Sequence, residues 1–195
     1  MTNLSNKLSQ RILITTPIKD SWPSKTQKVL FLGEWCKLYK DRELLKKYNS
    51  VTIPYHWNIN KKFNKDYENI NLIYENLIDI LSNKLNKVHK TRLKKSSWRI
   101  IIGPWLGIFS QIAFDRWYMI KKAYNEFTIS NTICINYDLE NQIPNDFDSF
   151  AKKYNDDVFN HIIYSEIIKL LGYKYSINNS PKFINKNREK NRKNL

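Results

Sequence analysis

The chain has 195 residues and a formal net charge of +15, with six Trp and twelve Tyr but only four Gly. A chain of this length buries a core without disulfide staples, and its aromatic content excludes a disordered protein. The charge favours a polyanionic partner, such as nucleic acid, a phosphorylated substrate or an anionic membrane surface. It is equally typical of lysines spread over the surface of an Ile- and Asn-rich protein, so charge alone does not define the function.

Short apolar runs near the N-terminus predict strands. The runs cover residues 11–16, 28–32 and 51–53, and each stops at a Pro or a Gly. The first two do not alternate apolar and polar residues, which is typical of parallel strands buried on both faces. Residues 37–48 have a helical composition and form the expected crossover between the second and third strands.

The middle of the chain predicts two long helices. Residues 61–89 carry apolar side chains at three- and four-residue steps, and the basic residues 90–95 follow as a connector. Residues 97–124 are apolar on nearly all sides, and we expect Gly103-Pro104 to bend or restart this helix. The β-branched residues at 100–102 leave a strand over 98–102 as an alternative.

The remaining third of the chain predicts a fourth strand at 132–137, a polar loop at 138–148 and a last helix at about 156–171. Asp156 or Asp157 complements the helix N-terminus, and Gly172 follows its end. The expected organisation is a flexible N-terminus (1–10), one α/β domain (11–176) and a basic disordered tail (177–195).

The location of the protein is predicted from its cysteines and its hydropathy. Cys36 and Cys134 lie far apart in apolar surroundings and predict buried, reduced thiols. Residues 1–10 contain no apolar secretion segment, and the longest apolar run, 100–109, is too short to span a bilayer. We therefore expect a cytoplasmic protein, with peripheral association at the inner face of the membrane as an alternative.

No spacing in the sequence predicts a metal or a cofactor. The four glycines do not form a phosphate-binding loop, and His56, His89 and His161 are scattered along the chain. We therefore expect neither a bound metal ion nor a cofactor.

Two residues that follow predicted strands are candidate catalytic groups. Glu34 comes directly after a strand that ends at Gly33, where ligands bind in open parallel sheets. His56 lies between Tyr55 and Trp57 and is a candidate general acid or base. The alternatives are an ion pair or helix cap for Glu34, and a hydrogen-bonded structural role for His56.

A second set of residues is predicted to bind substrate. Arg99 and Arg116 lie in apolar surroundings, where a guanidinium binds a phosphate or carboxylate or forms an ion pair that ties layers together. Aromatic rings provide walls against which sugars stack, and Asn160 and His161 lie on the last helix, where packing is the alternative role. The candidate substrate-binding residues are Trp35, Trp57, Arg99, Trp105, Asp115, Arg116, Asn160 and His161.

These clusters resemble the sugar-transferase family associated with bacterial O-antigen and other surface-polysaccharide gene clusters. The resemblance covers about residues 11–172, and it is carried by the blocks at 14–22, 29–39, 54–57, 98–106, 114–117, 156–161 and 164–168. It implies a Rossmann-like parallel sheet with long flanking helices, similar to the N-terminal, acceptor-side half of a GT-B glycosyltransferase or polyol-phosphate transferase. Family members are longer, so the resemblance implies that a C-terminal, donor-binding domain is missing or supplied by a separate chain.

Three functions follow from these observations. The first is the acceptor-side domain of a transferase, with a nucleotide-sugar or phosphorylated acceptor as substrate, in which Glu34, His56, Arg99 and Arg116 converge on one crevice. The second is a non-catalytic basic module that binds a polyanion, either nucleic acid or an anionic membrane surface; the Trp residues lie in apolar runs rather than among lysines, which counts against nucleic acid. The third is a folded, inactive remnant of the transferase.

Overall fold

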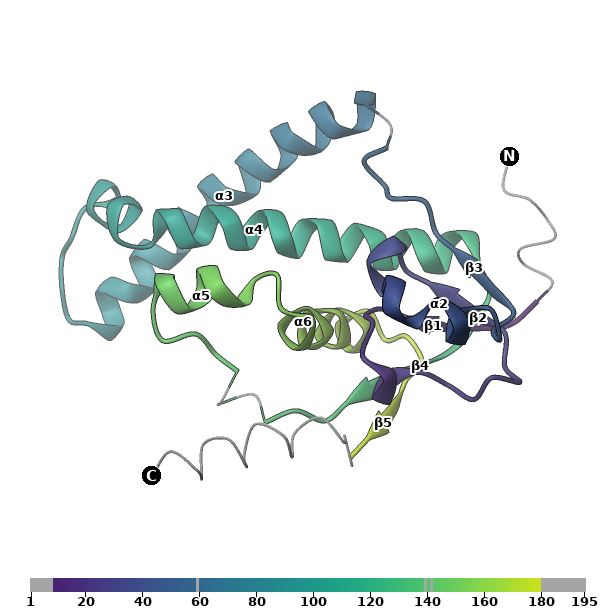
Figure 1. The fold of residues 1–195 in the computed structure, drawn as a ribbon. Coiled ribbons are helices and arrows are strands. Elements are labelled where there is room, and N and C mark those ends of the chain that lie inside the picture. The colour runs from purple at the N-terminus through teal and green to yellow at the C-terminus, as the bar shows by residue number, and fades with distance from the viewer. Residues whose placement is uncertain (1–8, 59, 139, 141, 180–195) are drawn as a thin grey trace, which may run out of the picture. The chain divides into compact units, whose positions relative to one another are not determined.

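The computed structural model describes residues 9–58, 60–138, 140 and 142–179 (Figure 1). Contacts between residues group the chain into two compact units. We name them the sheet unit, Met1–Tyr55 with Met119–Leu195, and the hairpin unit, His56–Tyr118. Most of the predicted flexible N-terminus and of the predicted disordered tail lies outside the described residues.

The sheet unit contains a five-stranded parallel sheet, which confirms the predicted α/β fold class (Figure 1). The strand order is β3-β2-β1-β4-β5. Four strands match the predicted runs with small differences in their bounds, and β5 lies partly in the tail that the sequence predicted to be disordered. The strands are β1 (Arg11–Ile14), β2 (Val29–Phe31), β3 (Ser50–Thr52), β4 (Ile129–Ile135) and β5 (Ser176–Asn178).

Burial explains why the central strands are apolar without alternation. Leu13 and Ile14 of β1 are fully buried, as is every residue of β2. A strand with neighbours on both edges and helices on its faces has no side exposed to water, so both sets of side chains are apolar.

The connections in the sheet unit are mostly short. The helices η1 (Lys19–Ser21), η2 (Glu34–Cys36) and η3 (Tyr39–Asp41) are single 3-10 turns, and α2 (Arg42–Leu45) is one α-helical turn. The prediction of one helix over residues 37–48 is therefore too long, because the α-helix there spans only Arg42–Leu45. Lys37 and Leu38 adopt extended backbone conformations, which interrupt the helical segment before η3.

The last two helices of the sheet unit have clear N-terminal caps. Helix α5 (Phe147–Lys153) begins with a capping box between Asp146 and Ser149, so the loop predicted at 138–148 ends earlier than expected. Helix α6 (Asp157–Leu170) is capped by Asp156, and Gly172 follows it with φ +68°, as predicted.

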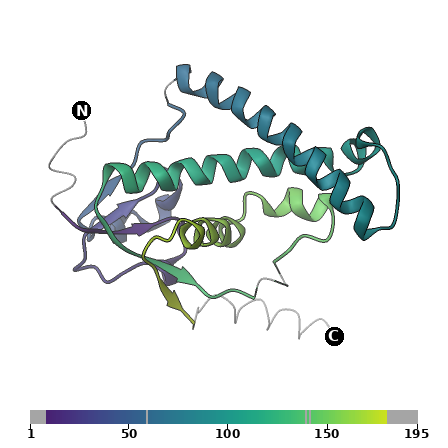
Figure 2. The same cartoon turned by 180° about the vertical axis from the view of Figure 1, so that it is seen from behind.

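The hairpin unit is built from two long helices joined by a connector (Figure 2). They are α3 (Asn60–Val88) and α4 (Lys95–Glu126). The last turns of α4, from Met119 onward, belong to the sheet unit. Helix α4 continues through Pro104, so the helix at 98–102 is confirmed and the helix does not restart after Gly103-Pro104. Tertiary packing supports the helix there, because the Tyr74 hydroxyl of α3 lies only 2.7 Å from where a Cβ on Gly103 would stand.

Within the part of the chain that the structure describes, no helix is both long and apolar enough to cross a membrane.

Candidate functional site

The carboxyl ends of the strands form one candidate site, in the sheet unit. The strand order reverses between β1 and β4, and open parallel sheets bind ligands in the crevice outside such a reversal. Thr16 follows β1 there, and Tyr137 follows β4. Glu34 and Trp35 follow β2, the next strand along this edge.

Glu34 and Trp35 differ in how firmly they are held. The Glu34 carboxylate is exposed and pairs with Lys37 at 2.7 Å, which is the ion-pair alternative considered from the sequence. The Trp35 indole donates a hydrogen bond to the Thr15 carbonyl oxygen at 3.0 Å, and its ring covers Gly33 so closely that a Cβ there would lie 2.1 Å from it. Because 37% of Trp35 stays exposed, this fixed ring presents a face on which a sugar can stack.

His161 ties the loops after β1 and β4 together. Its Nε2 accepts a hydrogen bond from the Ile135 amide at 3.0 Å, so the proton of the neutral ring is on Nδ1, which lies 3.2 Å from the Thr16 hydroxyl oxygen. Burial lowers the pKa of His161 to about 4. This geometry gives His161 a structural role, and Asn160 likewise donates to the carbonyl oxygens of Tyr154 and Asp156.

The low pKa of His161 predicts a loss of stability in acid. The unfolded chain protonates this ring below pH 6.5 whereas the folded chain resists protonation until about pH 4, so the unfolded state binds more protons in that window. We expect wild type to lose up to about 3 kcal/mol more free energy of unfolding than His161→Gln as the pH falls through this window. Urea titrations of both proteins at several pH values measure the difference, and parallel curves would contradict the assignment.

Tyr137 is a group at this edge that the sequence analysis missed. Its hydroxyl oxygen is buried and has no hydrogen-bond partner among the residues that the structure describes. Burial, together with the charges of Asp20, Asp156 and Asp157, raises the pKa of Tyr137 to about 12. The phenol is therefore neutral near these carboxylates, and as a buried group it belongs to the core beneath this edge. Its position at the end of the strand predicted over 132–137 was the available signal.

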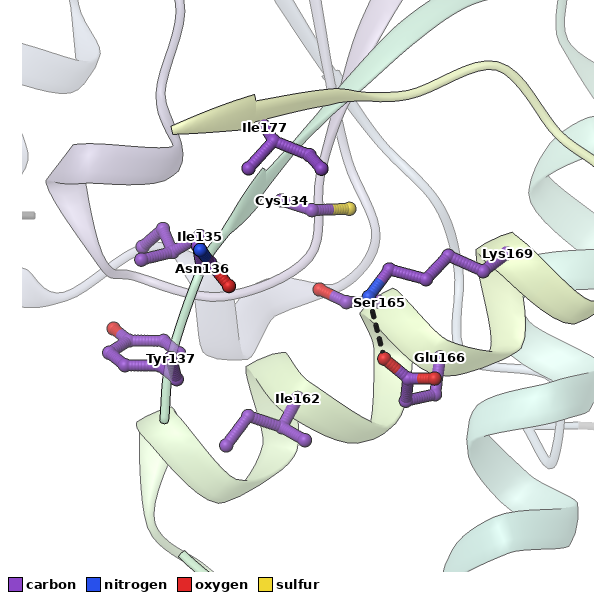
Figure 3. Close-up of a pocket in the computed structure, with 9 residues that line it drawn as sticks. All are labelled: Cys134, Ile135, Asn136, Tyr137, Ile162, Ser165, Glu166, Lys169 and Ile177. Carbon is purple, nitrogen blue, oxygen red and sulfur yellow. Dashed lines mark hydrogen bonds and ion pairs between the residues drawn. The ribbon is translucent and has the colours of Figure 1, made fainter. Parts of the chain in front are cut away.

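A small pocket lies between β4, β5 and α6 (Figure 3). Its volume is about 60 Å³, which holds about two water molecules and is too small for a sugar. Lys169 and Glu166 form an ion pair at 2.7 Å across its wall. Burial raises the pKa of the Cys134 thiol beside them, and that of Cys36 to about 12, so the predicted buried thiols are confirmed.

The hairpin unit holds a second candidate site, centred on His56. Only 3% of His56 is exposed, and its Nε2 lies 2.8 Å from Asp115 Oδ1. Lys62 Nζ lies 3.0 Å from Nδ1. An ammonium group only donates hydrogen bonds, so Nδ1 accepts and the ring proton is on Nε2, directed at Asp115.

Two further pairs extend this network. The Asp66 carboxylate accepts from the Trp57 indole at 2.9 Å and pairs with Lys62. Asp115 also pairs with its sequence neighbour Arg116. Lys62 and Arg116 thus each pair with one of the two carboxylates. Lys62 and Asp66 were missed, but their four-residue spacing places them on one helix face, which was a usable signal.

Arg99 does not belong to this network. It forms a bidentate pair with Glu75 of α3, at 2.6 and 2.7 Å, and this pairing holds the pKa of Glu75 down at about 2. Arg99 and Arg116 are 17 positions apart on α4, which is about 25 Å along the helix axis at about 1.5 Å per residue. The two guanidiniums therefore cannot bind one phosphate, and the predicted convergence of all four residues on one crevice is wrong. Trp105, the remaining candidate, stacks on Phe109.

Metal ligands do not cluster in the described part of the chain. None of the His, Cys, Asp and Glu side chains of these described residues gather in threes or more in a way that could hold a metal ion.

Comparison with known proteins shows which family the chain is similar to. A protein-family model described as LIC12162 family transferase matches residues 11–195 of the chain. No curated protein and no solved structure gives a significant match to the chain.

Proposed function

Because this chain belongs to the LIC12162 family of transferases, we propose that it is the acceptor-side domain of a transferase that builds bacterial surface carbohydrate. The single observation that carries the proposal is the buried His56–Asp115 pair, in which a carboxylate holds an imidazole in one tautomer. Enzymes use this pairing to prepare a general base. The GT-B architecture and the O-antigen context come from the sequence resemblance and are part of the proposal.

The proposed reaction transfers a sugar or a polyol phosphate to an acceptor hydroxyl. The acceptor oxygen attacks the anomeric carbon or the phosphorus of the donor, and the bond to the departing phosphate or nucleotide breaks. His56 Nδ1 takes the hydroxyl proton, and Asp115 stabilises the imidazolium that forms. In the structure the Lys62 ammonium donates a hydrogen bond to Nδ1. The acceptor hydroxyl must therefore displace this ammonium, whose side chain is 32% exposed.

The carboxyl edge of the sheet is a separate part of the proposal. Trp35 provides a fixed, partly exposed ring for stacking. Glu34 contributes a nearby exposed carboxylate that accepts hydrogen bonds. This edge therefore suits a neutral sugar ring. We assign the donor nucleotide to a second domain, in the same polypeptide or in a partner protein.

Product analysis tests the proposed activity. The protein isolated with any partner is incubated with a panel of nucleotide sugars and hydroxyl-bearing acceptors, and products are detected by mass spectrometry. We expect an acceptor to gain the mass of one sugar or polyol phosphate. Immunoprecipitation of the endogenous protein with intact-mass measurement identifies the donor-binding domain. Absence of transfer by a preparation that contains such a domain would contradict the proposal and favour the inactive remnant.

A further inference from the structure

The connector between α3 and α4, at one end of the hairpin unit (Figure 2), is rich in basic residues. We name residues 84–94 the basic tip. It contains five cationic and no acidic residues, and all five are exposed: Lys84, Lys87, Lys90, Arg92 and Lys94. None of these five has a carboxylate partner among the described residues. By contrast, the nearby Lys95 and Arg99 are neutralised by Glu75 and Asp79.

Exposed aliphatic side chains lie among these charges. Val88 is 72% exposed and Leu93 is 41% exposed. Trp98, the Trp nearest in sequence, is buried and donates its indole hydrogen to Asn86 at 3.0 Å, so it is not available to stack on a base. Basic residues with exposed aliphatic groups suit a lipid surface, whereas nucleic-acid modules expose aromatic rings.

Asn86 holds the tip in a defined shape. Its Oδ1 accepts hydrogen bonds from the Thr91 hydroxyl, the Leu93 amide and the Trp98 indole, and its Nδ2 donates to the Leu93 carbonyl oxygen. Lys90 completes the turn with φ 52°. Because the connector is fixed before it meets a partner, binding costs less conformational entropy than the ordering of a free loop.

We infer that the basic tip docks this protein on a membrane surface that contains anionic phospholipid. The cations contact the phosphate headgroups, while Val88 and Leu93 enter the headgroup boundary. This inference is independent of the proposed chemistry at His56, and it assigns a function to the surface charge that the sequence left undecided.

Binding to vesicles of phosphatidylcholine with about 30% phosphatidylglycerol tests the inference. The tip variant is Lys87→Gln, Lys90→Gln, Arg92→Gln and Lys94→Gln. The matched control removes the same charge from exposed positions elsewhere: Lys25→Gln, Lys28→Gln, Lys47→Gln and Lys65→Gln. Each basic group near an anionic surface contributes substantially to binding, so we expect the tip variant to bind on the order of 100-fold more weakly than wild type, and the control within about 3-fold.

A second variant separates lipid insertion from charge. Val88→Ser with Leu93→Ser keeps every cation, and we expect it to lose about 10-fold in vesicle binding while its binding to a single-stranded oligonucleotide stays unchanged. Circular dichroism confirms that each variant is folded. Three results would each overturn the inference: equal losses in the two quadruple variants, no binding by wild type, or tighter tip-dependent binding to the oligonucleotide than to the vesicles.

Discussion

Replacing His56 with alanine should lower the kcat of the transferase reaction by at least about 100-fold, because a positioned general base contributes about 10²–10⁴-fold to such steps. The fold should survive the change. Asp115 keeps its pair with Arg116, and Lys62 keeps its pair with Asp66, so no charge of the network is left without a partner. The measurement is steady-state kinetics with the donor and acceptor identified by product analysis.

Three comparisons make this result specific to the base. Imidazole added to His56→Ala should restore part of the activity, which a purely structural histidine would not allow. Asp115→Asn should also lower kcat, because an amide that donates to Nε2 moves the ring proton to Nδ1, toward the Lys62 ammonium. His89→Ala removes an exposed histidine of the same unit and should leave kcat unchanged. Wild-type kcat in His56→Ala would contradict the proposed mechanism.

The strands and the long helices could be predicted because local patterns encode them directly. The apolar runs at β1 and β2 are buried on both faces, and the periodic apolar positions of α3 follow from a helix that packs on one side. Helix α4 was harder, because Pro104 opposes a helix locally and only packing against α3 at Gly103 supports it. Strand β5 is too short and too exposed to leave a hydrophobic pattern.

The candidate sites were only partly predictable for a related reason. His56 and Asp115 were both identified, but their pairing joins residues 59 positions apart and depends on how α4 packs within the hairpin unit. Arg99 was predicted to bind substrate because its sequence neighbours are apolar, whereas in the structure its side chain pairs with Glu75. Sequence neighbours therefore indicated which residue types mattered, while three-dimensional packing determined their partners.

Trp22→Ala should be the most destabilising single change at the carboxyl edge of the sheet. Trp22 is 9% exposed, and its ring packs edge-on against Phe31 and Tyr48 at 5.3 and 5.6 Å between ring centroids. Its indole also donates to the Thr16 carbonyl oxygen at 3.1 Å. Truncation of a buried aromatic costs about 3–5 kcal/mol, which corresponds to a fall of roughly 10 °C in Tm for a chain of this size. Differential scanning calorimetry of wild type and Trp22→Ala measures the fall in Tm.

Trp35→Ala is the informative comparison for Trp22→Ala, because both indoles donate to carbonyl oxygens of the loop after β1. Trp35 is far more exposed, so its loss should cost only about 1–2 kcal/mol while weakening sugar binding. Trp22→Phe keeps a ring in the core and should lose little more than one hydrogen bond, about 1 kcal/mol. If Trp35→Ala destabilised the protein as much as Trp22→Ala and left ligand binding unchanged, Trp35 would be a core residue and the stacking surface would not exist.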